Sequence, residues 1–453
     1  MKVQFIGAAQ TVTGSKTYIE TKKCSALIDC GMYQGIKSIV DKNHSLISFD
    51  VTRLDYIILT HGHLDHCGLI PRYYKEGFRG RIICSPATRK IAEIIMLDSA
   101  RIQVSNYLKH KKDKTIKKSN KKGIEALYDE KDVYSCLELF DEIDYDSEYQ
   151  VNDISLTLRP AGHILGAAAL ELKYEDKITY FSGDIGRFND PMEYDPTVPD
   201  SIDNLFMETT YGDRDHDQAD PIEQLKKIIT ETKTNKGKIL IPSFAVARTQ
   251  LLLFYINKLF TKYPETKVPV YVDSPMTKKV TDLYSKFSQE LRPSESELEE
   301  IFSTATFLKW ESDYKKLKKK ESTYIIISAS GMVSGGRVLK YLDTIGRKSQ
   351  NTIALVGYQG EGTIGRQLSE GSKEIRLLGS LMPVRSKVVH LHTLSAHADR
   401  TELKSWITKI AKKPERIFLL HGELPTMKSF KEYISQDFQT KIHIAKEQEE
   451  IIL

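Results

Sequence analysis

One pattern recurs four times in the middle of the chain: an apolar segment of strand length, a turn of small residues, and an amphipathic helix. The four copies occupy residues 238–260, 268–287, 324–345 and 352–368. Consecutive strands joined by a helix lie parallel, because the helical crossover returns the chain to the same end of the sheet. The pattern therefore predicts a parallel, doubly wound α/β sheet in this region.

Both ends of the chain lack this alternation. Short strand-like segments fill the first third, together with a long amphipathic helix over residues 86–109, and strand-like segments return near the end. A chain of 453 residues exceeds one ordinary core, so we expect more than one domain. We predict a first domain formed by residues 1–208 and 386–453, with the α/β domain inserted at residues 209–385.

Composition indicates a globular chain without a membrane partner. Hydrophobic residues make up 40% and charged residues 28% of the sequence. No apolar stretch reaches the roughly 18 residues of a membrane span, and the N-terminus has no apolar signal segment, so we expect a cytoplasmic location. The five cysteines are scattered and odd in number, which predicts reduced thiols rather than disulfides or a cysteine-rich zinc site.

Two lysine-rich runs occur at residues 109–122 and 314–322. The net charge of +5 is mild for a chain of this length and gives weak support for an anionic partner. Runs of like charge are usually hydrated surface, so we favour solvated loops over dedicated nucleic-acid patches for both.

The segment HGHLDH, residues 61–66, follows an apolar strand-like segment and concentrates three of the 12 histidines of the chain beside an aspartate. Both residue types are metal ligands, and neither is favoured in a core. A structural zinc site would favour cysteines, whereas several imidazoles with a carboxylate suit two divalent ions, zinc or manganese. Two ions about 3.5 to 4 Å apart need more ligands than one loop supplies, so other segments must contribute.

Three further candidate ligands end strand-like segments beside glycine. They are His163 in RPAGHILGA, Asp184 in YFSGDIGR and His421 in FLLHGE. Each alone would be an ordinary core or surface residue, but their common position at strand ends favours one shared site.

These motifs resemble those of the metallo-β-lactamase superfamily and its β-CASP branch, which includes the endonuclease subunit of the mRNA 3′-end cleavage and polyadenylation machinery and bacterial and archaeal relatives. The motifs common to the superfamily are matched at Asp29, residues 61–66, His163 and Asp184. The motifs special to the β-CASP group are matched at Glu208, His397 and His421. The resemblance covers nearly the whole chain and implies an αββα sandwich with an inserted β-CASP domain.

The resemblance also implies how the ligands divide. One ion would be bound by His61, His63 and His163, and the other by Asp65, His66 and His421. Asp184 would bridge the two ions, and Asp29 would lie behind them and orient a ligand or the attacking water. Two such cations lower the pKa of a shared water, which yields hydroxide near neutral pH, and polarise phosphoryl oxygens.

His397 belongs to neither ligand set and is our candidate for the general acid that protonates the leaving oxygen. Glu208 is the carboxylate expected to poise it. The alternative for His397 is a cap or turn residue before a helix that Ser395 and Asp399 could cap. Cys67 adjoins the ligands, and we expect it to be a small buried residue.

The turns of the inserted domain indicate the substrate. They place small residues and helix N-termini at the carboxyl edge of a parallel sheet, where ligands bind and backbone N–H groups receive anions. We predict a track for successive phosphates, although each turn taken singly is an ordinary tight turn. The candidate contacts are Ser243, Arg248, Ser330, Gly331, Arg337 and Arg366.

DNA-processing relatives tend to lack histidine at the position of His421, so the resemblance implies a zinc-dependent endoribonuclease acting on single-stranded RNA and leaving a 5′ phosphate. Exonuclease activity from the 5′ end stays open. The alternatives are a small-molecule hydrolase of the thioesterase or lactonase type and an inactive RNA-processing scaffold. The inserted domain disfavours the first, and the complete ligand set disfavours the second. Homodimers are common among relatives, so a homodimer also stays open.

Overall fold

The computed structural model describes residues 1–112, 125–357 and 359–453. They form two compact units. The first unit consists of Met1–Asp215 and His397–Leu453, and the second of His216–Ala396.

The first unit contains two seven-stranded sheets. Across the first sheet the order is β22 (Glu450–Ile452), β1 (Lys2–Gly7), β2 (Lys16–Glu20), β3 (Ser25–Ile28), β4 (Tyr56–Ile58), β5 (Arg81–Cys84) and β6 (Phe140–Glu142). Across the second it is β21 (Lys441–Ile444), β20 (Arg416–Leu420), β11 (Asn204–Glu208), β10 (Lys177–Phe181), β9 (Ala168–Tyr174), β8 (Ile154–Pro160) and β7 (Glu148–Val151).

Apolar residues on both faces of the strands explain why these sheets are covered on both sides. Successive side chains of a strand point to opposite faces. Ile58 of β4 and Ile83 of β5 therefore join the core between the two sheets, whereas Ile57 and Ile82 join the core on the outer face of the first sheet. Phe206 of β11 faces the core between the sheets as well.

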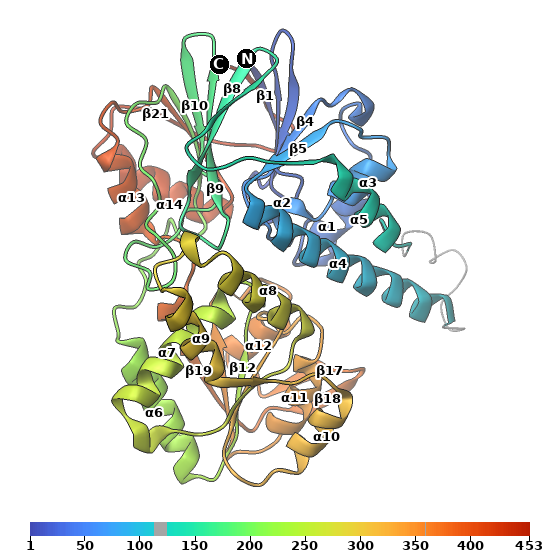
Figure 1. The fold of residues 1–453 in the computed structure, drawn as a ribbon, viewed down its shortest axis with the longest axis vertical. Helices are drawn as coiled ribbons and strands as arrows, with labels where there is room; N and C mark the ends of the chain where they lie inside the picture. The colour runs from blue at the N-terminus through green and yellow to red at the C-terminus, as the bar shows by residue number, and fades with distance from the viewer. Residues whose placement is uncertain (113–124, 358) are drawn as a thin grey trace. The chain divides into compact units, whose positions relative to one another are not determined.

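Helices cover the outer faces of the sandwich (Figure 1). On the first sheet these are α2 (Leu64–Cys67), α3 (Ile70–Lys75), α4 (Pro86–Lys112) and α5 (Glu130–Cys136), and on the second α13 (Arg400–Lys409) and α14 (Leu424–Ser435). Trp406 of α13 is 1% exposed and lies against Tyr180 of β10. The predicted αββα arrangement is confirmed.

The second unit contains a six-stranded sheet in which every pairing is parallel. Its order is β14 (Ala305–Phe307), β13 (Val270–Val272), β15 (Ile325–Ser328), β12 (Ile239–Pro242), β16 (Thr352–Val356) and β19 (Lys387–Leu391). Its helices are α6 (Pro221–Thr234), α7 (Arg248–Lys262), α8 (Pro275–Lys286), α9 (Glu295–Ser303), α10 (Glu311–Lys319), α11 (Val338–Ile345) and α12 (Ile364–Ser369). A hairpin of β17 (Glu374–Leu377) and β18 (Ser380–Pro383) completes it. The four predicted strand-and-helix units are β12 with α7, β13 with α8, β15 with α11 and β16 with α12.

Strand β19 lies in the sheet of the second unit, although our sequence analysis placed residues 386–453 in the first domain. It pairs in parallel with β16, from Thr352 opposite Lys387 to Val356 opposite Leu391. The apolar pattern of this segment indicated a strand but carried no information about its partner. The chain returns to the first unit at His397.

The second lysine run is a helix rather than the predicted loop, because α10 includes most of it. Asp313 accepts hydrogen bonds from the backbone N–H groups of Lys309 at 3.1 Å and Trp310 at 3.0 Å, which caps the first turn. Leu317 is 4% exposed and joins the core of the second unit. One cap and one buried apolar side chain therefore outweigh the repulsion among the lysines.

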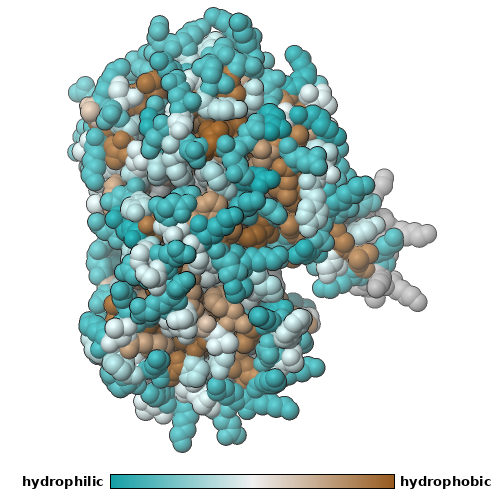
Figure 2. Space-filling model, viewed as in Figure 1, coloured by the Kyte–Doolittle hydropathy of each residue, from teal (hydrophilic) through white to brown (hydrophobic). Residues whose placement is uncertain are grey.

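The first lysine run is described only in part. Residues 109–112 form the end of α4, and residues 113–122 lie outside the described residues. No helix in the described ranges is long and apolar enough to cross a membrane. The face drawn in Figure 2 is covered largely by hydrophilic residues, with smaller hydrophobic areas between them.

Candidate metal centre

Three neighbouring strands of the second sheet end at one edge and bring chemistry-bearing side chains together. β10, β11 and β20 pair in parallel. Asp184 follows β10 by three residues, Glu208 is the last residue of β11, and His421 directly follows β20. Because parallel strands end at the same edge of a sheet, these side chains meet despite their separation in sequence.

The remaining ligand candidates come from the first sheet and from the loop after β8. The chain leaves β4 and reaches His61 and His63, and Asp65 and His66 then lie in the short helix α2. His163 follows the end of β8 by three residues. His61, His66 and His163 are nearly or fully buried.

Close backbone contacts hold α2 in place. The N–H of Ser15 donates to the carbonyl of Asp65 at 2.8 Å, and the N–H of Cys30 donates to that of His66 at 2.7 Å. A Cβ at Gly31 would lie 1.6 Å from the Asp65 carbonyl oxygen, so only glycine fits where this segment crosses the helix. The position of two ligand side chains is therefore fixed through their own backbone.

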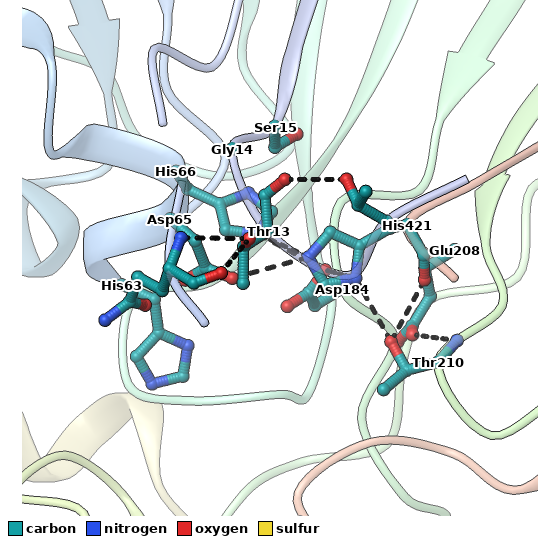
Figure 3. A network of polar contacts seen from close by, with 12 residues as sticks. Thr13, Gly14, Ser15, His63, Asp65, His66, Asp184, Glu208, Thr210 and His421 are labelled. Carbon is teal, nitrogen blue, oxygen red and sulfur yellow. Dashed lines mark hydrogen bonds and ion pairs between the residues drawn. The ribbon is translucent and has the colours of Figure 1, made fainter. Parts of the chain in front are cut away.

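Asp184 lies between two groups of imidazoles. Its Oδ2 is 3.5 Å from Nε2 of His61 and 3.5 Å from Nε2 of His163. Its Oδ1 is 3.5 Å from Nε2 of His66 and 3.6 Å from Nδ1 of His421. Figure 3 shows Asp184, His66 and His421 converging from separate segments.

The other two candidates complete the groups. Nδ1 of His63 is 3.1 Å from Nε2 of His61 and 3.3 Å from Nε2 of His163. Oδ2 of Asp65 is 3.5 Å from Nε2 of His421. The donor atoms thus gather into a set of His61, His63, His163 and Asp184, a set of Asp65, His66 and His421, and a third set of Asp184, Glu208 and His421.

The spacing of these atoms fits a bound cation. Four donors placed tetrahedrally about 2.1 Å from an ion lie about 3.4 Å apart. The distances from Asp184 to the four imidazoles are 3.5 to 3.6 Å. Its Oδ1 is buried and has no hydrogen-bond partner among the described residues. A buried carboxylate oxygen without a donor is costly, and a cation between it and the imidazoles would remove that cost.

Burial keeps part of the histidine cluster neutral. It lowers the pKa of His61 well below its usual value and that of His63 to about 4. Both rings therefore offer a lone pair at neutral pH. Burial raises the pKa of the Cys67 thiol well above its usual range, and Sγ donates to the carbonyl of Gly62 at 3.5 Å. Cys67 is thus a buried thiol, as expected.

Carboxylates have the opposite effect on the second group. Burial favours the neutral form of His66, but Asp184 and Asp29 outweigh it and raise the pKa of His66 well above its usual value. For His421, Asp184 likewise outweighs burial and raises the pKa. Burial would raise the pKa of Asp184, but His421 and the other imidazoles lower it well below its usual value. This carboxylate is therefore charged and suited to a cation.

Asp29 lies behind His66 and determines which ring nitrogen faces the cluster. Its Oδ2 lies 2.7 Å from Nδ1 of His66 and accepts a hydrogen bond from Oγ of Ser15 at 3.1 Å. Its Oδ1 accepts from the backbone N–H and the hydroxyl of Thr60, both at 2.9 Å. A carboxylate only accepts, so Nδ1 of His66 carries a proton, and Nε2, which faces Asp184, is the ring nitrogen that would bind an ion once its own proton is released.

Two threonines in contact with ligands were not identified from the sequence. Oγ1 of Thr60 lies 3.1 Å from Nδ1 of His61, and Oγ1 of Thr210 lies 3.1 Å from Nδ1 of His421. Each hydroxyl can orient its imidazole. The sequence offered one indication of these two residues, namely that they lie close to candidate site residues. Thr60 directly precedes His61, and Thr210 follows Glu208 by two residues.

Glu208 and His397 form a pair beside the cluster. Nδ1 of His397 lies 3.0 and 3.1 Å from the two carboxylate oxygens of Glu208. Glu208 also accepts hydrogen bonds from the backbone N–H groups of Ile185 at 2.7 Å and Thr210 at 3.2 Å, which fix its position. Nδ1 of His397 is 4.0 Å from Oδ2 of Asp184.

The position of His397 differs from that of a helix cap. Asp399 caps α13, because its side chain accepts from the N–H of Glu402 at 2.8 Å. The side chain of His397 is 17% exposed, compared with 3% for Asp184. His397 therefore lies on the open side of the buried cluster.

The six predicted phosphate contacts all lie in the second unit, apart from this cluster in sequence. Ser243 follows β12 and is fully buried, and its hydroxyl accepts a hydrogen bond from Thr249 at 3.1 Å. Ser330 and Gly331 follow β15. The hydroxyl of Ser330 accepts from the N–H of Ser334 at 3.0 Å.

The three arginines begin or adjoin helices that follow the same strands. Arg248 is the first residue of α7 and donates to the carbonyl of Leu394. Arg337 directly precedes α11 and forms an ion pair with Asp273. Arg366 lies in α12, and its Nε donates to Glu370 at 2.6 Å. These three arginines thus have protein partners.

A four-layer αββα sandwich with imidazoles and carboxylates gathered at its strand ends defines a class of metal-dependent hydrolases. Family models agree with this class. The model of the metallo-beta-lactamase superfamily matches residues 12–128, that of the Beta-Casp domain residues 249–368, and that of the Zn-dependent metallo-hydrolase RNA specificity domain residues 381–445. The chain belongs to the metallo-β-lactamase superfamily, in its β-CASP branch.

Individual relatives align over nearly the whole chain. A ribonuclease of Thermus thermophilus is 30% identical over 93% of each chain. An RNase J-like protein of Methanocaldococcus jannaschii is 33% identical over 93% of this chain and 92% of its own. Transcription termination factor FttA of the same organism is 29% identical over 98% of this chain and 70% of its own. A solved structure of a protein of unknown function from Enterococcus faecalis superposes with a TM-score of 0.56 at 15% identity, over 100% of this chain and 99% of that one, which supports the fold alone.

Proposed function

We propose that this protein is a metal-dependent endoribonuclease that hydrolyses phosphodiester bonds in single-stranded RNA with two divalent ions, zinc in preference to manganese. The observation that carries the proposal is the carboxylate of Asp184, whose two oxygens face two separate groups of imidazoles. The Glu208 and His397 pair lies beside it. The names of the Thermus and Methanocaldococcus relatives support RNA as the substrate.

The distances support the following ligand roles. His61, His63 and His163 would hold one ion, Asp65, His66 and His421 the other, and Asp184 would contact both. Divalent ions bound there supply Lewis-acid polarisation of a phosphoryl oxygen and lower the pKa of an attacking water. Asp29, Thr60 and Thr210 orient the rings, so that little reorganisation is needed when substrate arrives.

His397 would supply the proton to the departing oxygen. Glu208 accepts a hydrogen bond from Nδ1, so Nε2 is the atom that donates. Attack of water on phosphorus with loss of the 3′ oxygen leaves a 5′ phosphate and does not require the 2′-hydroxyl. General-acid catalysis of this kind typically contributes about 10²- to 10⁴-fold to the rate.

The second unit would bind the RNA strand. Backbone N–H groups of the turns after β12, β15 and β16 are suited to phosphates, and the nearby arginines add positive charge. We keep Ser243, Arg248, Ser330, Gly331, Arg337 and Arg366 as the proposed contacts. A cytoplasmic location and a homodimer stay predictions.

A gel assay on matched RNA and DNA oligonucleotides tests the proposal. Purified protein reconstituted with zinc or with manganese would be incubated with RNA labelled at either end, beside lanes containing a chelator. The matched variants are Asp184→Asn, which removes the bridging charge, and His397→Asn, which removes the proton donor but no ligand. His44→Asn, a change of an exposed histidine outside the cluster, is the control.

We expect wild type and the control to form internal RNA fragments with 5′ phosphates. These fragments should be absent with chelator and strongly reduced in both site variants. Cleavage of neither polymer by the reconstituted protein would refute the proposal. Products released only one nucleotide at a time would correct it from internal cleavage to an exonuclease.

A further inference from the structure

The two tryptophans of the chain occupy opposite environments. Trp406 is 1% exposed and lies in the core of the first unit, whereas Trp310 is 69% exposed at the start of α10 in the second. Backbone hydrogen bonds to Asp313 fix the chain at this point. A large aromatic ring is therefore held on the surface by a capped helix end.

The outward face of α10 is positively charged. Tyr314 and Leu317 point inward and pack with the core of the second unit. The lysines between and after them are exposed, at positions 315, 316, 318 and 319. Within the described part of the chain, no acidic side chain lies within 4 Å of the ammonium groups of these four lysines.

The acidic residues near Trp310 are already occupied. Both carboxylate oxygens of Glu311 lie 2.9 Å from Nζ of Lys340, and Asp313 serves as the cap. Glu311 and Asp313 also attract Lys315 and Lys316, but two carboxylates do not balance the lysines of α10, so this face keeps a net positive charge. The remaining positive charge is available to an anionic partner.

Helix α10 packs beside α11, which begins next to a residue proposed to bind phosphate. The hydroxyl of Tyr314 donates to the carbonyl of Lys340 at 3.3 Å, which joins α10 to α11. The N–H of Lys340 in turn donates to the carbonyl of Arg337 at 3.0 Å, so the two lie one helical turn apart. Figure 1 shows α10 and α11 together at the edge of the second unit.

We propose that Trp310 and the four exposed lysines of α10 form a docking surface for single-stranded RNA. The surface, which we call the α10 surface, rests on the proposed function and extends the RNA path beyond the turns of the parallel sheet. A base stacks on the exposed indole, and the lysines contact the adjoining phosphates. Sequence-independent binding of single strands uses this combination of an aromatic platform and basic side chains.

Charge decides between RNA and a protein as the occupant. Lysine is depleted in the buried centres of protein interfaces, because its ammonium group is costly to desolvate. Apart from Trp310, the exposed residues of α10 are lysines, Glu311 and Ser312 rather than a continuous apolar area. Phosphates keep the ammonium groups paired and partly hydrated, which a protein interface would not.

Two α10 variants and one matched control test the surface. Trp310→Ala removes the stacking platform, and a second variant changes Lys315, Lys316, Lys318 and Lys319 to Gln. The control changes Lys23, Lys75, Lys173 and Lys441 to Gln, which removes the same charge from exposed positions of the first unit. Each zinc-loaded protein is measured for KM on a single-stranded RNA of about 20 nucleotides. Hydrolysis of bis(p-nitrophenyl) phosphate normalises each protein for an intact metal centre.

Fluorescence gives a second readout that does not depend on turnover. Stacking of a base quenches an exposed indole, whereas the buried Trp406 stays constant, so saturating oligouridylate reduces the emission of wild type. Trp310→Ala retains only Trp406 and serves as the blank. Titration with the RNA in the presence of chelator reports binding even when no cleavage occurs.

We expect each α10 variant to raise the RNA KM by on the order of tenfold. The lysine variant also lowers the slope of log affinity against log salt by about 0.7 for each phosphate that the protein no longer neutralises. In the control variant, the RNA KM and the salt slope change much less. Equal KM values for the α10 variants and the control, or wild-type emission that RNA leaves unchanged, would overturn the proposal.

Failure of the proposed function gives a different result. If wild type hydrolyses the small phosphodiester but not RNA, the ribonuclease proposal fails. The fluorescence titration still decides whether the α10 surface binds a single strand.

Discussion

Replacing Asp29 by Asn tests how a residue that need not touch a metal controls the centre. The amide presents one oxygen and one NH2 group in place of two acceptors. If the NH2 faces His66, it meets the protonated Nδ1, which lies 2.7 Å from the carboxylate in wild type. If it faces Thr60, it meets the backbone N–H that donates to the carboxylate at 2.9 Å in wild type. In either orientation two hydrogen-bond donors face each other. In the first orientation, relief requires the Nδ1 proton of His66 to move to Nε2, the atom that faces Asp184.

The size of the effect follows from these distances. Removal of the group that orients a metal ligand typically lowers metal affinity by about 10- to 100-fold, or about 1.4 to 2.7 kcal/mol. Because Asp29 contacts His66 and not the group of His61, His63 and His163, the weakening should be confined to one of the two proposed ions. We expect Asp29→Asn to retain about one equivalent of zinc under conditions in which wild type retains two.

Competition with a chromophoric chelator measures the zinc affinities of each variant, and elemental analysis after dialysis measures its zinc content. Asp153→Asn is a matched control, because Asp153 also accepts from a hydroxyl and a backbone N–H, at 2.6 Å from Thr21 and 3.2 Å from Lys23, away from the cluster. Circular dichroism checks the fold of each variant. Two equivalents of zinc bound with wild-type affinity in a folded Asp29→Asn protein would refute the reasoning.

Three other outcomes follow from the structure. His397→Ala should lower kcat on RNA by about 10²- to 10⁴-fold with the metal content unchanged, and loss of metal from this variant would argue for a ligand role instead. Gly31→Ala places a Cβ 1.6 Å from the carbonyl oxygen of Asp65 and should lower both the melting temperature and zinc affinity, whereas Gly335→Ala, with no atom within 4 Å, should leave zinc affinity unchanged. In the metal-free protein the raised pKa of His66 stabilises the folded state. This stabilisation is complete below pH 6.5, the usual pKa of histidine, and is lost as the pH rises toward the pKa of His66 in the folded protein. The melting temperature of the metal-free protein should therefore fall from pH 6.5 to about 8. Above that pH the buried Lys16, whose pKa burial lowers to about 8, loses its proton in the folded state and begins to raise the stability. A melting temperature that rises between pH 6.5 and 8 would contradict the direction of the His66 pKa shift.

Much of the fold is predictable because its signals are local. The alternation of strands and helices in residues 238–368 forces parallel pairing, whatever the rest of the chain does. The lysine run at 314–322 was mispredicted because its charge pattern resembles a loop, whereas burial of Leu317, packing of Tyr314 and the cap at Asp313 favour the helix. β19 was assigned to the wrong sheet for a different reason, since strand character is local but the choice of partner is not.

The candidate site also has a part that local sequence predicts and a part that it does not. The residue types at His61, His63, Asp65 and His66 suffice to propose a metal loop, since imidazoles and carboxylates at this density have little other use. The contact of Thr210 with His421 joins segments 211 residues apart and leaves no local pattern.

The sequence by itself determined which side chains can bind a metal, most of the segments that form strands and helices, and that the middle of the chain folds as a parallel sheet. These properties depend on residue chemistry and on hydrophobic periods of a few residues. Only the tertiary structure decided that the two oxygens of Asp184 face different groups of imidazoles, that Asp29 orients His66, and that Trp310 stays exposed. Strand order and packing bring distant residues within a few ångströms, and no short stretch of sequence specifies those distances.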